Sequence, residues 1–156
     1  ARYGLDALFT STLQTDLKLY SNEEVNHFVQ IEKARIERYK KSESSLAIIH
    51  FANLDDLFAT LGRKTAQVFK EISAVFKSEF RDSDLITAKN ESLYAVIMTE
   101  TSSHNATQAI ERLNESIKAL FAESLDFTLQ INSHISNIMD INDINDVINQ
   151  FVQVKE

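Results

Sequence analysis

Three charged side chains of this sequence have the types and spacing of a candidate phosphate site. Arg81 and Asp84 stand three residues apart, just after a predicted helix, and Arg112 lies in a later predicted helix. An arginine fork can bind a phosphate through two hydrogen bonds, and a carboxylate accepts hydrogen bonds from N–H groups. The same residues also have purely structural explanations, in which Arg81 complements the dipole at a helix C-terminus and Asp84 closes a turn. Arg112 could equally pair with a neighbouring carboxylate of its own helix, Glu111 or Glu115.

A second cluster near the C-terminus superficially resembles a calcium loop, and comprises Asp140, Asn142, Asp143, Asn145 and Asp146. It lacks the central glycine and the terminal glutamate of such a loop. Isoleucines recur at every third position through the same stretch, which predicts the start of a helix with repeated N-caps. The four histidines are scattered along the chain, and no metal site is expected.

Composition limits the ligands further. The 156 residues carry 16 Lys and Arg against 23 Asp and Glu, a net charge of −7 that argues against a nonspecific nucleic-acid binder. The two glycines, Gly4 and Gly62, stand far apart, so glycine-rich phosphate loops are absent. The absence of cysteine rules out disulfides and thiol nucleophiles. No apolar run is long enough to cross a membrane, and we expect a cytoplasmic segment without direct membrane insertion.

Hydrophobic periodicity predicts the elements that position these side chains. The expected elements are a short helix from 12 to 20, a helix over 23–41, a strand over 46–51, helices over 54–61 and 65–80, hairpin strands over 84–87 and 93–98, a helix over 105–123, a strand over 127–132 and a helix over 140–154. This order predicts an α+β fold with helices packed on a mostly antiparallel sheet.

The helix over 23–41 should begin after a cap at Ser21 or Asn22. Its apolar residues fall on one side at 100° per residue, so that this face is expected to pack on the sheet. The face comprises Val25, Phe28, Val29, Ile36 and Tyr39. A signalling helix in this position could also form a homodimer.

The run Arg81-Asp82-Ser83-Asp84-Leu85 is followed eight residues later by the strand over 93–98. Asn22, Leu61-Gly62 and Thr101 stand at further matching positions. In this layout, residues 16–153 resemble the diguanylate cyclase, or GGDEF, family. The resemblance implies the nucleotide-cyclase palm, a ferredoxin-like topology with an N-terminal helix. It divides the chain into residues 1–15, an N-terminal helix or linker from a missing upstream domain, and residues 16–156, a degenerate GGDEF domain.

The sequence departs from the family where catalysis would occur. The hairpin that should read Gly-Gly-Asp/Glu-Glu-Phe reads Asn90-Glu91-Ser92-Leu93-Tyr94, and only the aromatic is retained. His50 replaces a metal-binding aspartate, and we expect it to be a hydrogen-bonded strand histidine. Phe58 and Ala66 stand where the family has guanine-contacting residues. We therefore expect no cyclase activity and no metal or other cofactor.

The family has a second nucleotide site, an inhibitory site for cyclic di-GMP. The resemblance places Arg81, Asp84 and Arg112 in that site, where arginine can bind phosphate or guanine and aspartate can accept from guanine. The expected function is a cyclic di-GMP receptor that signals to neighbouring domains of a larger bacterial protein, which could be membrane-anchored. One alternative is a nucleotide-free interaction or dimerisation module. A weaker alternative is a non-catalytic GTP sensor.

Overall fold

The computed structural model describes residues 18–40, 42–90, 92–125 and 127–155. Two short 3-10 helices, η1 (Gly62–Lys64) and η2 (Ile138–Asp140), accompany the main elements. The main elements are α2 (Asn22–Tyr39), β1 (Ser45–Phe51), α3 (Leu54–Leu61), α4 (Thr65–Glu79), β2 (Leu85–Asn90), β3 (Leu93–Met98), α5 (Ser103–Leu125), β4 (Ile131–Asn137) and α6 (Ile144–Lys155). Their order confirms the predicted α+β fold.

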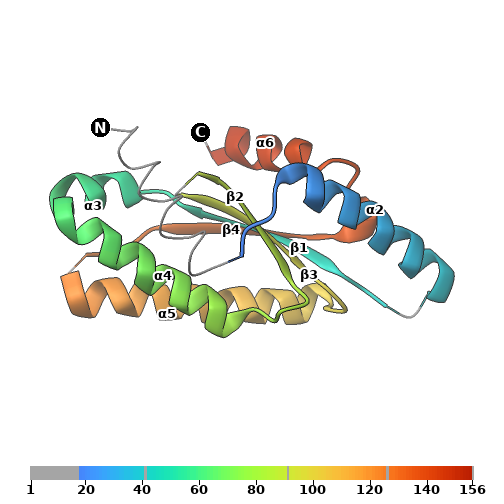
Figure 1. Cartoon of the computed structure of the whole chain (residues 1–156), viewed down its shortest axis with the longest axis horizontal. Coiled ribbons are helices and arrows are strands. Elements are labelled where there is room, and N and C mark those ends of the chain that lie inside the picture. The colour runs from blue at the N-terminus through green and yellow to red at the C-terminus, as the bar shows by residue number, and fades with distance from the viewer. Residues whose placement is uncertain (1–17, 41, 91, 126, 156) are drawn as a thin grey trace.

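The sheet has four antiparallel strands in the order β2-β3-β1-β4. β1 lies in the interior of the sheet because its apolar run can be covered on both faces. Ala47, Ile49 and Phe51 join the core under α3, α4 and α5, whereas Leu46 and Ile48 join the core under α2 and α6. The sheet is therefore enclosed between two helical layers (Figure 1).

α2 begins at a capping box in which the Ser21 hydroxyl accepts from Glu24 N and the Glu24 carboxylate accepts from Ser21 N. Such caps stabilise a helix by about 1 kcal/mol. Val25, Val29 and Ile36 are buried as predicted, and Phe28 is partly buried. Tyr39 was assigned to the same face, but it is 60% exposed. The buried face includes Glu32 instead, and the helix ends at Tyr39 because Lys40 adopts a left-handed conformation.

The segment before α2 differs from its prediction. Residues 1–15, assigned to an upstream helix or linker, lie outside the described residues, as do residues 12–17 of the predicted first helix. The last two residues of the predicted first helix pair with β2 instead of forming a helix. Leu19 forms an isolated parallel β-bridge with Ile86, and Tyr20 N donates to Ile86 O at 2.8 Å. The backbone groups at the outer edge of β2 thereby gain a partner.

The hairpin strands are longer than predicted on one side. β2 begins at Leu85 and extends to Asn90, so that only residues 91 and 92 separate it from β3. The Asn90 side chain accepts from Ser92 N at 2.8 Å, which stabilises a tight turn that the polar composition of the stretch did not reveal.

The last strand and helix are shifted from their predicted bounds. β4 covers 131–137 rather than 127–132. Gln130, the residue before it, bonds to the loop after β1: Ala52 N donates to Gln130 O, and Asn53 Oδ1 accepts from Gln130 N. α6 begins at Ile144 rather than at residue 140. Asp143 accepts from Asn145 N at 2.8 Å, so that the polar cluster provides a helix start as predicted.

Candidate functional site

The turn that carries Arg81 and Asp84 follows the end of α4. Phe80 leaves the helix in an extended conformation, and its ring packs against Phe76 with centroids 5.8 Å apart. Asp84 N then donates to Arg81 O at 3.0 Å, and Arg81 N donates to Asp84 Oδ2 at 3.0 Å. The side chain and backbone of Asp84 thus close the turn, as one of the two interpretations of the sequence predicted.

Asp84 is also the buried half of an ion pair. Its side chain is 4% exposed, and Oδ1 accepts from Arg81 Nη2 at 3.2 Å and from Thr99 N at 3.2 Å. Both carboxylate oxygens therefore have partners within the chain. A buried carboxylate requires such partners, because each one offsets part of the cost of removing the charge from water.

Arg81 is held on one side and open on the other. Nη2 also donates to Thr99 O and, at 3.0 Å, to Thr101 Oγ1. No described residue accepts a hydrogen bond from Nε or Nη1, and 53% of the side chain is exposed. The guanidinium plane is thus oriented by the protein through Nη2 alone, while two of its three nitrogens donate to no described residue.

Arg112 lies at the same end of α4. Its Nη2 is 2.9 Å from Glu79 Oε1, and Nε donates to the same oxygen at 3.1 Å. The observed partner is therefore Glu79 rather than the neighbouring Glu111 or Glu115. Because Glu79 stands two residues before Arg81, this ion pair brings Arg112 to the end of the helix that carries the Arg81 turn. The Arg112 side chain is 62% exposed.

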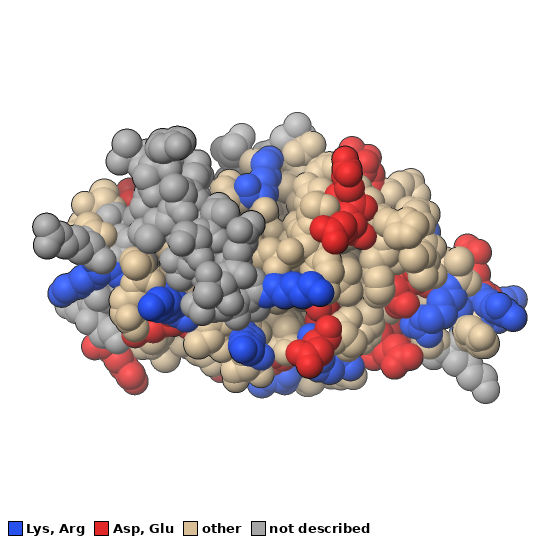
Figure 2. Space-filling model, viewed as in Figure 1, with Lys and Arg blue, Asp and Glu red and all other residues tan. Residues whose placement is uncertain are grey.

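The surface charges do not form a wide basic field on the face shown in Figure 2, where blue and red side chains of the described residues are interspersed. With a net charge of −7, long-range attraction of an anion is unfavourable. An anionic ligand would have to be recognised by short-range contacts to individual arginines.

His50, at the position of the family's metal-binding aspartate, lies near the end of β1. It pairs in register with Leu93 of β3 and Asn132 of β4. Its ring contacts Phe151 edge-on, with centroids 6.3 Å apart. The buried Nδ1 makes no hydrogen bond to a described residue, so the expectation of a hydrogen-bonded histidine is wrong at this atom. Burial lowers the pKa of His50, and the nearby charge of Asp55 opposes that shift.

The hairpin residues beside His50 are largely part of the two cores. Leu93 is buried on the α2 and α6 side, and Tyr94 on the opposite side. The Tyr94 ring lies 5.5 Å from that of Phe51 and 4.9 Å from that of Phe76, and burial raises the pKa of its hydroxyl. Phe51 N donates to Ser92 O at 2.8 Å, so the structure brings His50 and the hairpin together.

The donors described here do not fit magnesium, which prefers carboxylate and other oxygen ligands. His50 offers an imidazole, and the Asn90 side-chain oxygen already accepts from Ser92 N. No group of three His, Cys, Asp or Glu side chains that could hold a metal occurs among the described residues. Ala66 is half-buried in the first turn of α4. Glu91 and the side chain of Phe58 lie outside the described part of the chain.

Sequence reasoning missed two residues that shape the arginine site. Thr99 contacts Arg81 through its backbone oxygen and Asp84 through its backbone N–H, which no side-chain pattern could reveal. Glu79 was visible as a carboxylate near Arg81, but its partner lies 33 residues later in the chain. Only the packing of α4 against α5 identifies that pair.

Comparison with known proteins gives a family and a set of folds. A family model described as diguanylate cyclase, GGDEF domain, matches residues 17–153. A search of curated proteins found no match. Among solved structures, the chain is similar to the diguanylate cyclase SiaD from Pseudomonas aeruginosa, which was crystallised with its activator SiaC. The two share 18% identity with a TM-score of 0.61, over 76% of this chain but only 46% of the SiaD chain.

Two further structures are similar over most of both chains. The GGDEF domain of DgcB from Caulobacter crescentus, solved in complex with c-di-GMP, is 12% identical with a TM-score of 0.59 over 76% of this chain and 72% of that one. The active GGEEF domain of a diguanylate cyclase from Vibrio cholerae is 18% identical with a TM-score of 0.62 over 83% of each chain. At these identities the likeness concerns the fold.

Proposed function

The chain belongs to the diguanylate cyclase GGDEF family, and from that premise we propose that it is a non-catalytic domain that binds cyclic di-GMP at Arg81 and Arg112. The ligand's presence is passed to a neighbouring domain or partner of the protein. The observation that carries the proposal is the pair of half-exposed guanidinium groups at one end of α4, each oriented by a carboxylate, Asp84 or Glu79.

The charge and geometry of these two groups suit a cyclic dinucleotide. The ligand presents two phosphates and two guanine edges, and an arginine fork can bind either with two hydrogen bonds. Arg81 Nε and Nη1 donate to no described residue, so these atoms are available for ligand contacts, while Nη2 holds Asp84, Thr99 and Thr101. Arg112 would share its charge between Glu79 and the ligand.

Asp84 contributes mainly by positioning Arg81. For Asp84 to accept hydrogen bonds from guanine as well, as the sequence predicts, the ligand would have to compete for oxygens that now hold the turn. Arg81 is therefore the residue on which the proposal depends most strongly.

Three features support the absence of cyclase activity. His50 provides an imidazole in place of a carboxylate, the hairpin has no glycine, and Leu93 and Tyr94 are buried in the cores. Two-metal phosphoryl transfer requires carboxylates that hold the metal ions and a backbone that approaches the phosphates closely. The same losses disfavour a GTP sensor in this region.

The proposal places the domain inside a larger signalling protein. No helix among the described residues is long and apolar enough to cross a membrane. We propose a cytoplasmic position for the domain, next to neighbouring domains that read the state of α2.

Calorimetric titration of Arg81 variants with cyclic di-GMP tests the proposal. Arg81→Ala should lose about 2 to 4 kcal/mol of binding free energy, a loss of roughly 30- to 1000-fold. Arg81→Lys should recover little of it, because a single ammonium cannot replace the planar fork. Arg38→Ala removes an exposed guanidinium from α2 that contacts Tyr39 and serves as the matched control, with an expected change below about twofold. If Arg81→Ala binds cyclic di-GMP as tightly as the wild type, the receptor proposal is wrong, and the nucleotide-free interaction module takes its place.

A further inference from the structure

A three-residue segment, residues 99–101 between β3 and α5, contacts both the Arg81 turn and the neighbourhood of α2. On the turn side, Thr99 N donates to Asp84 Oδ1, and Arg81 Nη2 donates to Thr99 O and Thr101 Oγ1. On the opposite side, Glu100 N donates to Ser44 Oγ at 3.0 Å. We call these residues the 99–101 segment.

Ser44 continues the connection into α2. It is fully buried, and its hydroxyl donates to Glu32 Oε2 at 2.8 Å. Glu32, 5% exposed, also accepts from both Nε and Nη2 of Arg35, at 2.8 and 3.1 Å. The hydrogen bond from Arg35 holds the pKa of Glu32 below its usual range. Loss of any one partner of this buried carboxylate destabilises the folded state around it, because water can replace few of its hydrogen bonds.

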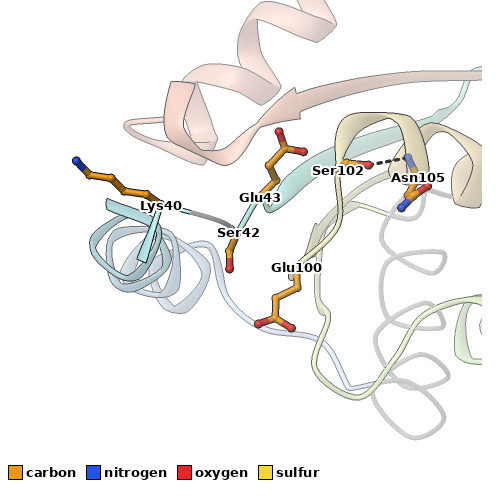
Figure 3. Close-up of a pocket in the computed structure, with 6 residues that line it drawn as sticks. All are labelled: Lys40, Ser42, Glu43, Glu100, Ser102 and Asn105. Atoms are coloured by element: carbon orange, nitrogen blue, oxygen red, sulfur yellow. Dashed lines mark hydrogen bonds between the residues drawn. The ribbon is translucent and has the colours of Figure 1, made fainter. Parts of the chain in front are cut away.

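The conformation of the segment depends on these contacts. Glu100 adopts a left-handed backbone conformation with φ of 51°. Residues other than glycine and asparagine rarely adopt this conformation without support from surrounding contacts. Glu100 and Ser42 line a hollow of about 440 Å³ together with Glu43, Ser102 and Asn105. Figure 3 shows these side chains around it. The segment therefore has open space on one side into which it can shift.

A bidentate ligand must compete with the segment for Arg81. All of the hydrogen bonds from the Arg81 guanidinium to described residues leave from Nη2, which has two hydrogens and three acceptors. Arginine offers two forks, Nε with Nη2 and Nη1 with Nη2, and both include this atom. A phosphate or guanine edge bound through either fork thus withdraws at least one hydrogen from Asp84, Thr99 or Thr101.

We infer that binding of a guanine nucleotide or its phosphate to Arg81 releases the 99–101 segment and thereby loosens the C-terminal half of α2 through Glu100, Ser44 and Glu32. This inference rests on the proposed function and adds how occupancy of the site is communicated. The 99–101 segment is the element with two states. In one state it is hydrogen-bonded to Arg81, and in the other the ligand has replaced it at Arg81. α2 is the helix through which the preceding chain reaches the domain, so that a change in its stability can be read upstream.

Amide hydrogen exchange with and without cyclic di-GMP tests the first half of the inference. Saturating ligand should speed exchange at residues 99–101 and at residues 32–39 of α2 by about threefold or more. Residues 22–28 provide an internal control, because Asn26 ties that half of the helix to Asp143 and Ile144 N instead. Binding that leaves exchange at 32–39 unchanged overturns the inference while the proposed function stands.

Reciprocity provides the second test. If the ligand favours the released segment, weakening its hold on α2 should tighten ligand binding. Ser44→Ala should bind cyclic di-GMP about threefold or more tightly than the wild type, and Asn26→Ala, the matched control, should not. Glu32→Gln weakens the same connection, because an NH2 donor replaces one of the two oxygens that accept from Arg35 and Ser44. It replaces Ser44→Ala if that variant is too unstable. Unchanged affinity in these variants contradicts the inference.

A third measurement separates failure of this inference from failure of the proposed function. If the wild type binds no cyclic di-GMP, the urea unfolding constants of Arg81→Ala, Ser44→Ala and the double variant still report whether the two sites are coupled. If the effects were independent, the change in the unfolding constant of the double variant would be the product of the changes in the two single variants. A departure from that product by threefold or more supports the connection in the absence of the nucleotide. A simple product overturns it.

Discussion

The hairpin and the Arg81 turn are the two regions where the family places nucleotide chemistry, and they are held together by different forces. The hairpin is stabilised by strand pairing and by the burial of Leu93 and Tyr94. The turn is stabilised by the charged side chains that would bind a ligand, since Asp84 and Arg81 form its internal hydrogen bonds.

This difference explains how the hairpin can keep its backbone without the glycines and acidic residues that are typical of the family. Pairing in a β-hairpin and apolar burial do not require the side chains that hold a metal, so the hairpin can keep its shape with Asn90, Ser92 and His50 in place. The turn has less freedom, because replacing Asp84 removes the acceptor of Arg81 N and replacing Arg81 removes the Nη2 contacts with Asp84 and Thr99. The contrast yields predictions that separate the two regions.

The largest expected effect concerns catalysis at the hairpin. The purified domain with GTP and magnesium or manganese should form no cyclic di-GMP, because an imidazole and a hairpin without glycine replace the required groups. Chromatography of the nucleotides after prolonged incubation provides the measurement. Protein-dependent product that disappears in His50→Ala would show that the hairpin region still works as an active site.

Removal of the retained aromatic should affect stability strongly. Tyr94→Ala opens a cavity between Phe51 and Phe76 and should cost about 3 to 5 kcal/mol of unfolding free energy. Tyr39→Ala is the matched control, because that side chain is 60% exposed and should change stability by less than about 0.5 kcal/mol. Urea denaturation measures both. Equal effects in the two variants would show that Tyr94 is not part of the core.

The turn should lose less stability when its buried carboxylate is neutralised. Asp84→Asn weakens the contacts with Arg81 and Thr99 N and should cost about 1 to 3 kcal/mol. Asp82→Asn changes an exposed residue of the same turn and should have little effect. If both variants unfold at the same urea concentration as the wild type, the turn is held by its backbone alone.

The smallest expected effect is a pH dependence at His50. Burial lowers the folded-state pKa of His50, so that below about 6.5 the unfolded chain binds a proton that the folded domain excludes. Stability should therefore decrease as the pH falls from 7 towards 5, and less so in His50→Leu. His104→Leu removes an exposed histidine as the control. Identical pH profiles for wild type and His50→Leu would contradict this assignment.

Much of the fold could be predicted because it depends on local patterns. Continuous apolar residues predict β1, and the periodicity of residues 65–80 and 105–123 predicts α4 and α5 within a few residues. β4 was displaced in the prediction because the apolar alternation of residues 127–132 resembles a strand, whereas the pairing with β1 runs from Ile131 to Asn137. Such contacts join residues far apart in sequence.

The candidate site was predictable in its residues but not in its contacts. Arg81, Asp84 and Arg112 are visible through their types and through the family resemblance. Their partners Thr99 and Glu79 depend on the packing of β3 and α5 beside the end of α4. The exposure of Tyr39 was missed because periodicity does not show where a helix extends past the sheet.

Selective binding to the wild-type domain tests the central claim most directly. Cyclic di-GMP and GTP are titrated separately into the domain in a calorimeter, with ligand up to about 100 micromolar, where even a weak specific site is measurable. The account predicts saturable binding of cyclic di-GMP and none of GTP, because the arginines remain while the hairpin region lacks its nucleotide contacts. Binding of GTP alone, or of neither nucleotide, would contradict it.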